Sequence, residues 1–144
     1  MKKLYLQLLQ LLSEIPEIKY TDLNFGQLQE EKPPLAYPAV LINLNCQTVD
    51  DVQDAFQILS GSFDLTIICK MYAESNGNAP KEAQEKALEY LDLTEKIYQK
   101  LQGWEGNGFE SFTRKSCRDV AMRKGLKTAV QTFETSWREC TSSS

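Results

Sequence analysis

The strongest constraint on the fold is a run of alternating apolar residues near the middle of the chain. From Phe63 to Met71 every second residue is apolar, and the residues between them are mostly polar. Successive side chains of a β-strand point to opposite faces, so this run predicts a strand over residues 63–72 with one face in a core. The preceding Ser60-Gly61-Ser62 is typical of a turn.

A second strand follows three prolines at positions 33, 34 and 38. Each proline fixes its own φ and favours extended geometry in the residue before it. Residues 39–45 then contain Val40-Leu41-Ile42, which is apolar on both faces and indicates a central or covered strand. A shorter strand is expected at residues 18–21, followed by a polar loop over residues 22–32. Between residues 46 and 59 the pattern weakens and predicts a loop or an irregular hairpin arm.

Two segments carry the spacing of amphipathic helices. The first spans residues 2–13, and Pro16 follows its end. The second spans residues 81–102, with Pro80 at a position where its missing N–H costs nothing. Gly103 is the expected left-handed residue beyond the helix, and Trp104 is placed for the accompanying apolar contact.

Two further strands are predicted at residues 109–120 and 126–137, joined by a turn over residues 122–125. The fold class is therefore α+β. We expect a single mixed or antiparallel sheet of about five strands, with an N-terminal helix and one long helix before the last two strands. Residues 1–140 are expected to form one domain, and residues 141–144 a disordered tail. The uncovered sheet face is expected to be apolar and to be covered by other subunits.

Charge and hydropathy exclude two classes of partner. The formal net charge is −4, the wrong sign for affinity that comes from neutralising nucleic-acid phosphates. The longest apolar run, residues 39–44, is far shorter than the roughly 20 residues that cross a bilayer. We therefore expect neither direct nucleic-acid binding nor a membrane span.

Catalytic and metal-binding signals are missing from the sequence. The chain has no histidine, and its four cysteines lack the spacing of zinc or redox sites, which favours a reducing cytosol. Cys69 falls within the strand pattern and is expected to be a small buried hydrophobe. Asp50, Asp51 and Asp54 lack the spacing of a calcium loop and are expected to be solvated surface. We assign no catalytic residue, no cofactor and no metal.

The C-terminal hairpin is locally basic in this acidic protein. Its basic residues are Arg114, Lys115, Arg118, Arg123, Lys124 and Lys127. Either this hairpin is simply solvated, or surfaces of opposite charge meet between subunits.

The order of these segments resembles the tail-terminator, or tail-completion, proteins of long-tailed bacteriophages, a family that includes the lambda minor tail protein U. The resemblance covers residues 2–137. It rests on Ile18-Lys19-Tyr20, Gly26-Gln27-Leu28, the run from Pro34 to Ile42, the strand at 63–72, Ala87-Leu88, Leu91, Leu101-Gln102-Gly103-Trp104, Arg118-Asp119 and residues 130–135.

The resemblance implies a mechanical role. Subunits of this family form a ring, typically a hexamer, that docks on the growing end of the tail tube and stops its polymerisation. The ring also meets the neck proteins of the filled head, and DNA passes through it without specific binding. Bacterial cytoplasm during assembly, and then the virion tail, are the implied locations.

Two regions are the expected subunit or tube contacts, the arm at residues 47–57 and the loop at residues 26–31. The arm combines aspartates with apolar side chains, as an interface with an apolar centre and a charged rim does. The candidate interface residues are Gln27, Gln47, Asp50, Asp51, Val52, Asp54, Phe56, Arg114 and Arg118.

Two other readings stay open. The chain is alternatively another virion part, such as a head–tail connector or baseplate adaptor, which the sequence does not separate from a terminator. A small-molecule binder or enzyme would instead use a pocket beneath the long helix, with Tyr90, Tyr98 and Arg114 as its polar groups.

Overall fold

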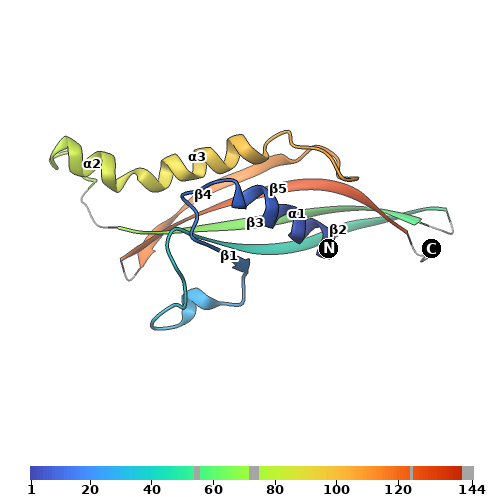
Figure 1. Ribbon diagram of the computed structural model, residues 1–144, viewed down its shortest axis with the longest axis horizontal. Coiled ribbons are helices and arrows are strands. Elements are labelled where there is room, and N and C mark those ends of the chain that lie inside the picture. Colours follow the sequence, from blue (N-terminus) through green and yellow to red (C-terminus); the bar gives the residue numbers. More distant parts are fainter. Residues whose placement is uncertain (54–55, 72–74, 124, 141–144) are drawn as a thin grey trace.

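The computed structural model describes residues 1–53, 56–71, 75–123 and 125–140 (Figure 1). Its helices are α1 (Lys2–Ser13), α2 (Lys81–Ala87) and α3 (Glu89–Leu101), with a short 3-10 turn, η1 (Gln27–Gln29). Its strands are β1 (Tyr20–Leu23), β2 (Ala39–Gln53), β3 (Phe56–Lys70), β4 (Thr113–Arg123) and β5 (Leu126–Cys140).

These five strands form one mixed sheet in the order β1-β2-β3-β5-β4. β1 pairs in parallel with β2, and the other neighbours are antiparallel. The predicted α+β class, with an N-terminal helix and helical structure before the last two strands, is confirmed. Among the described residues, no helix has the length and apolar character that a bilayer span requires.

One face of the sheet packs against α1 and α3 and forms the main core. Leu4 and Leu8 of α1 and Ile97 of α3 are buried with the apolar face of β3. At its centre the ring of Phe63 stacks on Phe133, with the centroids 5.4 Å apart. The alternation that predicted β3 therefore marks the face that meets the helices.

The opposite face of the sheet is mostly polar, which contradicts the expected apolar face. A small apolar cluster of Ala39, Leu41, Ile68 and Leu126 does lie there, but Leu28, Leu35 and Tyr37 of the η1 region cover it. Beyond that cluster the face carries polar pairs such as Thr132, whose hydroxyl donates to Asp64 at 2.6 Å. In the part of the chain that the structure describes, the apolar cluster on this face is therefore covered within the subunit.

Of the two alternatives expected for residues 46–59, a loop or an irregular hairpin arm, the structure has the hairpin. β2 continues to Gln53 and β3 begins at Phe56. The register shifts between Cys46 and Thr48 and again between Asp51 and Gln53. A β-bulge adds one residue to one strand and reverses the phase of side-chain alternation beyond it. The period-two pattern is therefore hidden in the sequence although the pairing continues.

Ser60-Gly61-Ser62, predicted to be a turn, lies inside β3. A Cβ atom on Gly61 would stand 2.6 Å from the carbonyl oxygen of Asn45 and 2.9 Å from Cη2 of Trp137. Glycine within a strand is typical of such a close approach. The residue allows packing here and does not reverse the chain.

The predicted long helix is divided into α2 and α3 by Leu88, whose φ of −95° and ψ of 5° depart from helical values. Neither glycine nor proline marks this break in the sequence. The predicted end is confirmed, because Gly103 has a φ of +77° and Trp104 packs against Phe112. The strand predicted from residue 109 begins at Thr113, since Phe109 and Phe112 enter the core from the preceding loop.

Cys69 is buried in the core, as predicted, and burial raises the pKa of its thiol to about 11. Cys46 and Cys117 are also free thiols, and Cys117 is exposed. Because thiolate is the reactive form, we expect a thiol reagent at neutral pH to label Cys117 in the folded protein and Cys69 only after unfolding. Mass spectrometry of labelled peptides, with and without denaturant, measures this. Cys117→Ser is the matched control, and rapid labelling of Cys69 in the native state would contradict it.

Candidate assembly interface

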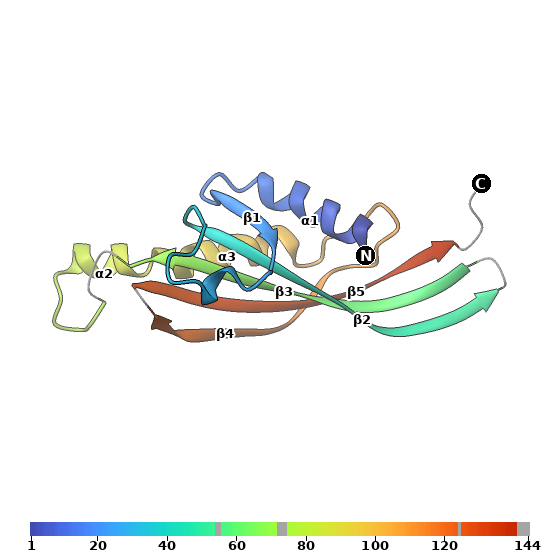
Figure 2. The same cartoon turned by 90° about the horizontal axis from the view of Figure 1, so that it is seen from below.

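Three strands extend beyond the helices at one end of the molecule. Figure 2 shows β2, β3 and β5 running past α1 and α3 toward the end of the molecule at which β5 finishes. We call this part the arm and define it as residues 46–53, 56–61 and 135–140. Cys46, Gly61 and Thr135 are paired across the three strands and mark its base. The described residues of the predicted contact region, 47–53 and 56–57, lie within this arm.

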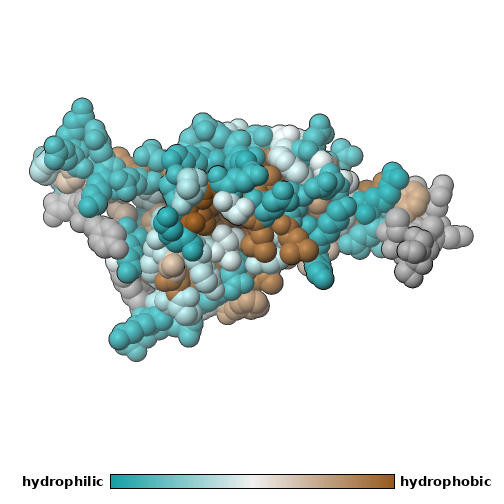
Figure 3. Space-filling view, in the orientation of Figure 1, coloured by the Kyte–Doolittle hydropathy of each residue, from teal (hydrophilic) through white to brown (hydrophobic). Residues whose placement is uncertain are grey.

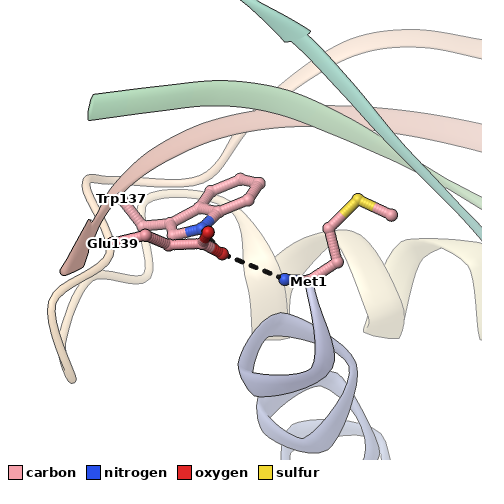
Figure 4. A network of polar contacts seen from close by, with 3 residues as sticks. All are labelled: Met1, Trp137 and Glu139. Carbon is pink, nitrogen blue, oxygen red and sulfur yellow. Dashed lines mark hydrogen bonds and ion pairs between the residues drawn. The ribbon is translucent and has the colours of Figure 1, made fainter. Parts of the chain in front are cut away.

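Aromatic packing fixes the base of the arm to the helical layer. Trp137 of β5 and Leu59 of β3 are buried there, and the Phe109 ring meets the Trp137 ring at 6.0 Å. The Trp137 indole donates to Glu139 at 3.2 Å, and the same carboxylate lies 3.3 Å from the ammonium group of Met1 (Figure 4). The base of the arm is therefore held by apolar packing and by charge.

The pKa of Glu139 lies below its ordinary value, chiefly because of the hydrogen bond from Trp137 and secondarily because of the Met1 ammonium. A carboxyl group whose folded-state pKa is lowered stabilises the fold above its unfolded pKa, and that stabilisation is lost as pH falls through the folded-state pKa. Glu139→Gln should lower the free energy of unfolding near neutral pH by less than about 1 kcal/mol, because the group is half-exposed.

Denaturant unfolding of wild-type and Glu139→Gln protein across acidic to neutral pH measures this difference. It should close as the solution becomes more acidic than the folded-state pKa. Glu95→Gln, an exposed change on α3, is the control and should show no such pH-dependent difference. A difference for Glu139→Gln that is constant over the whole range would contradict the assignment.

The arm presents both acidic and apolar side chains, as predicted. Asp50 and Asp51 are exposed, and Asp51 accepts a hydrogen bond from Gln57 at 2.7 Å. Phe56 is half-buried beneath the guanidinium of Arg138, 4.6 Å from its ring centroid. Asp54 and the side chain of Val52 lie outside the described residues.

The arm also presents one polar and one apolar side chain, those of Gln47 and Val49. Gln47 donates from its side chain to the hydroxyl of Ser62 at 3.2 Å. Val49, which lies in the predicted contact region but is not among the candidate interface residues, is 50% exposed. Its place next to Asp50 and Asp51 was visible in the sequence, but the bulge concealed the face on which it lies.

Gln27 lies apart from the arm and serves its own loop. Its side chain is buried, accepts from the backbone of Phe25 at 2.7 Å and donates to the Leu23 carbonyl at 3.0 Å. Its side chain is therefore already used within the subunit. Phe25 is 73% exposed beside it and is the better contact candidate in this loop. An aromatic residue in a polar loop next to Gly26 was the signal that could have identified it.

Arg114 and Arg118 lie on opposite faces of β4. Arg114 pairs with Phe133, and its guanidinium stacks 3.9 Å from the Tyr98 ring centroid and donates to Gln131 at 3.3 Å. Arg118 pairs with Val130 and is exposed. Arg114 thus connects α3 to the sheet through its contacts with Tyr98 and Gln131, whereas Arg118 is available to a partner.

The pocket proposed for the small-molecule reading does not bring its three groups together. A cavity of about 500 Å³ lies under the helices and is lined by Tyr90, but neither Tyr98 nor Arg114 reaches it. The Tyr90 hydroxyl instead donates to Asp119 at 3.3 Å. Eight helical residues separate the two tyrosines, about 12 Å along the axis, which explains the separation.

The face in Figure 3 is mostly hydrophilic, with a hydrophobic patch near the middle of the molecule. Among the residues that the structure describes, no group of three or more acidic, cysteine or histidine side chains is arranged to hold a metal ion. The features that stand out are the arm and the sheet edges.

No protein-family model matches the sequence, and a comparison with curated proteins finds no match.

Proposed function

We propose that this protein is a structural subunit of a phage or prophage tail, a tail terminator that assembles into a ring on the tail tube. The ring stops polymerisation of the tube and provides the surface that joins tail to head. Its partners are further copies of itself, the tail tube protein and the head–tail neck proteins, with DNA passing through without specific binding. It works in the bacterial cytoplasm during assembly and remains in the virion tail.

The observation that carries this proposal is the projecting arm. A three-stranded extension with acidic and apolar side chains, fixed at its base by Trp137, offers a stiff contact surface away from the core. Isolated two-stranded hairpins are only marginally stable in water, and the third strand strengthens this one. Such a construction suits contact with another protein better than it suits a reaction.

The resemblance in segment order supports the same proposal. The family's implied fold has a helix at the start and a longer helix before the last strands, and this chain has the same order. Fold alone does not establish function, so the test must measure capping.

The decisive experiment is a capping assay with the tail tube protein encoded in the same genome. Purified tube protein is allowed to polymerise with and without this protein, and tube lengths are measured by electron microscopy. We expect substoichiometric amounts to shorten the tubes and to leave a ring at one end. Tubes of unchanged length would contradict the proposal, and a ring that binds tube ends without changing tube length would favour another connector protein.

The arm aspartates should matter for capping and not for folding. Asp50→Asn/Asp51→Asn should leave the free energy of unfolding within about 1 kcal/mol, because exposed surface substitutions usually change it by less than about 0.5 kcal/mol each. Capping should weaken at the same protein concentration. Glu82→Asn/Glu85→Asn on α2, also exposed, is the control with the same loss of charge. Normal capping by the arm variant, or a sharp drop in its stability, would contradict the assigned contact.

A further inference from the structure

Two stretches of the sheet edge have no strand beside them in the described part of the chain. β4 is the last strand on one side. On the other side β1 pairs with β2 only from Ala39 to Ile42. β2 has 15 residues and its first four are paired with β1, so eleven keep a bare outer edge. β4 also has 11 residues, so the two bare edges match in length.

The strand directions allow these two edges to pair between copies. β2, β3, β5 and β4 are successively antiparallel, so β2 and β4 run in opposite directions on opposite sides of the sheet. A second copy moved sideways, without being turned over, places its β2 antiparallel beside β4 of the first. In one copy α1 and α3 lie on the same side of the sheet (Figure 2). Two copies related in this way keep their helices on the same side of one continuous sheet.

The two edges carry opposite charges on the same face. Arg118 pairs with Val130 of β5, which pairs with Thr66 of β3, whereas Asp50 pairs with Ile58 of β3. Ile58 and Thr66 are eight residues apart in one unshifted strand, so they point to the same face, away from Phe63. Arg118 and Asp50 are both exposed there, and neither side chain makes a hydrogen bond or an ion pair within the described part of the chain.

From these observations we infer that β4 of one copy pairs antiparallel with the bare edge of β2 in the next copy, with Arg118 opposite Asp50. Counting residue by residue in this register, Arg123 lies opposite Asn45. β4 therefore ends before it reaches the part of β2 that β1 occupies. Unpaired edges are ready templates for strand addition, and opposite charges across strands stabilise one register.

This contact is head-to-tail, since different surfaces of the two copies meet. Repetition of such a contact produces a ring when the rotation closes and a filament when it does not. The inference rests on the proposed function, because it takes a second copy of this protein as the partner of both edges. Arg118 and Asp50 are then the residues that the ring would use. Its test therefore measures self-association without any tube protein.

Reversal of the two charges separates this contact from other modes of assembly. Arg118→Glu places two acidic groups at each junction, and Asp50→Arg places two basic groups there. In an equal mixture of the two variants, each junction between unlike copies again joins opposite charges. Sedimentation velocity at low salt over a concentration series should show about tenfold weaker association for each variant alone, because like charges face each other. The mixture should return to the wild-type association.

Matched controls carry the same charge changes elsewhere. Lys81→Glu and Glu85→Arg are exposed substitutions on α2, away from both edges, and should associate as the wild type does, alone or mixed. Circular dichroism of all four variants should match the wild type, because the substituted side chains are on the surface. A wild-type protein that stays monomeric throughout the series would overturn the inference. A mixture that associates no more strongly than either variant alone would overturn it too.

A cysteine cross-link tests the register itself. Cys117 and Asp51 both lie on the face that carries the helices, and with Arg118 opposite Asp50 they are opposite one another between copies. Opposed side chains of an antiparallel pair are near the spacing of a disulfide. Asp51→Cys, with Cys46→Ser and Cys140→Ser, should form a ladder of cross-linked species under mild oxidation. Cys117→Ser should abolish that ladder, and a product limited to dimers would overturn the head-to-tail arrangement.

The two proposals fail separately. If the wild-type protein caps tubes but neither charge reversal weakens self-association, the edge pairing is overturned and the proposed function stays intact. Restoration in the mixture, together with tubes that grow uncapped, would support the edge pairing and contradict the proposed function.

Discussion

Replacing Phe63 by alanine should lower the free energy of unfolding by about 3–5 kcal/mol, the usual cost of removing a large buried aromatic side chain. The Phe63 side chain is 0% exposed and lies in the middle strand of the sheet. Its ring stacks on Phe133 and meets the edge of Phe112 at 5.2 Å. The three rings join β3, β5 and the loop before β4, so a cavity at this point weakens contacts among all three.

Chemical denaturation followed by circular dichroism measures the effect. Phe25→Ala is the matched control, since the same side chain is removed from a position that is 73% exposed. It should change the free energy of unfolding by no more than about 0.5 kcal/mol. A loss below about 1 kcal/mol for Phe63→Ala would mean that the aromatic cluster is not the centre of the core.

The sequence predicts the core of this fold well because burial is periodic there. The alternation that includes Phe63 marked one face of β3, and the spacing within α1 marked its buried side. In both cases the backbone conformation is regular along the segment, so residues that point to one face recur at a constant spacing in the sequence. The end of α3 was equally clear, because Gly103 adopts the left-handed conformation that the sequence predicts.

The arm was harder to predict because its pattern changes phase. After the bulge near Gln47 the alternation resumes on the other face, so Val49 and Leu59 are paired although the sequence shows no continuous period. The break at Leu88 left no signal either, since no glycine or proline stands there. A periodic pattern is informative only while the backbone geometry that produces it stays regular.

The candidate interface could be predicted in part. Asp50 and Asp51 were identified from composition, because charged residues beside apolar ones are visible in a sequence. The separation of Arg114 from Arg118 was not, because it depends on the register of β4 against β5. The bare edges were also hidden, since which strands end a sheet depends on the order of strands in space. Strand order depends on contacts between residues far apart in the chain.

The contrast between the two faces changes the physical argument for assembly. Among the described residues, the apolar cluster on the polar sheet face is already covered by the η1 region, so assembly through that face would gain little from the hydrophobic effect. Backbone hydrogen bonds along an edge gain affinity from pairing, and charges set the register. Association of this kind should weaken as salt increases, because exposed charges are screened beyond about 10 Å at 0.1 M ionic strength.

Gly61 lies at the base of the arm, beside the Trp137 ring of the core. Gly61→Val should lower the free energy of unfolding by about 2–3 kcal/mol. Its added Cβ would stand 2.6 Å from the Asn45 carbonyl oxygen and 2.9 Å from the Trp137 ring. Overpacking of this kind usually costs about 1–3 kcal/mol, and the backbone oxygen cannot turn away as a flexible side chain does. β2 and β5 must therefore shift away from β3 at the base of the arm.

The same substitution should weaken self-association, because Gly61 pairs with Cys46, which lies on the bare edge of β2. Gly77→Val is the matched control, since a Cβ at Gly77 meets nothing within 4 Å. It should change stability by no more than about 0.5 kcal/mol and leave association unchanged. Denaturant unfolding gives the first quantity, and sedimentation at a temperature where both variants are folded gives the second. A folded Gly61→Val protein that associates as the wild type does would show that the base of the arm does not control the edge.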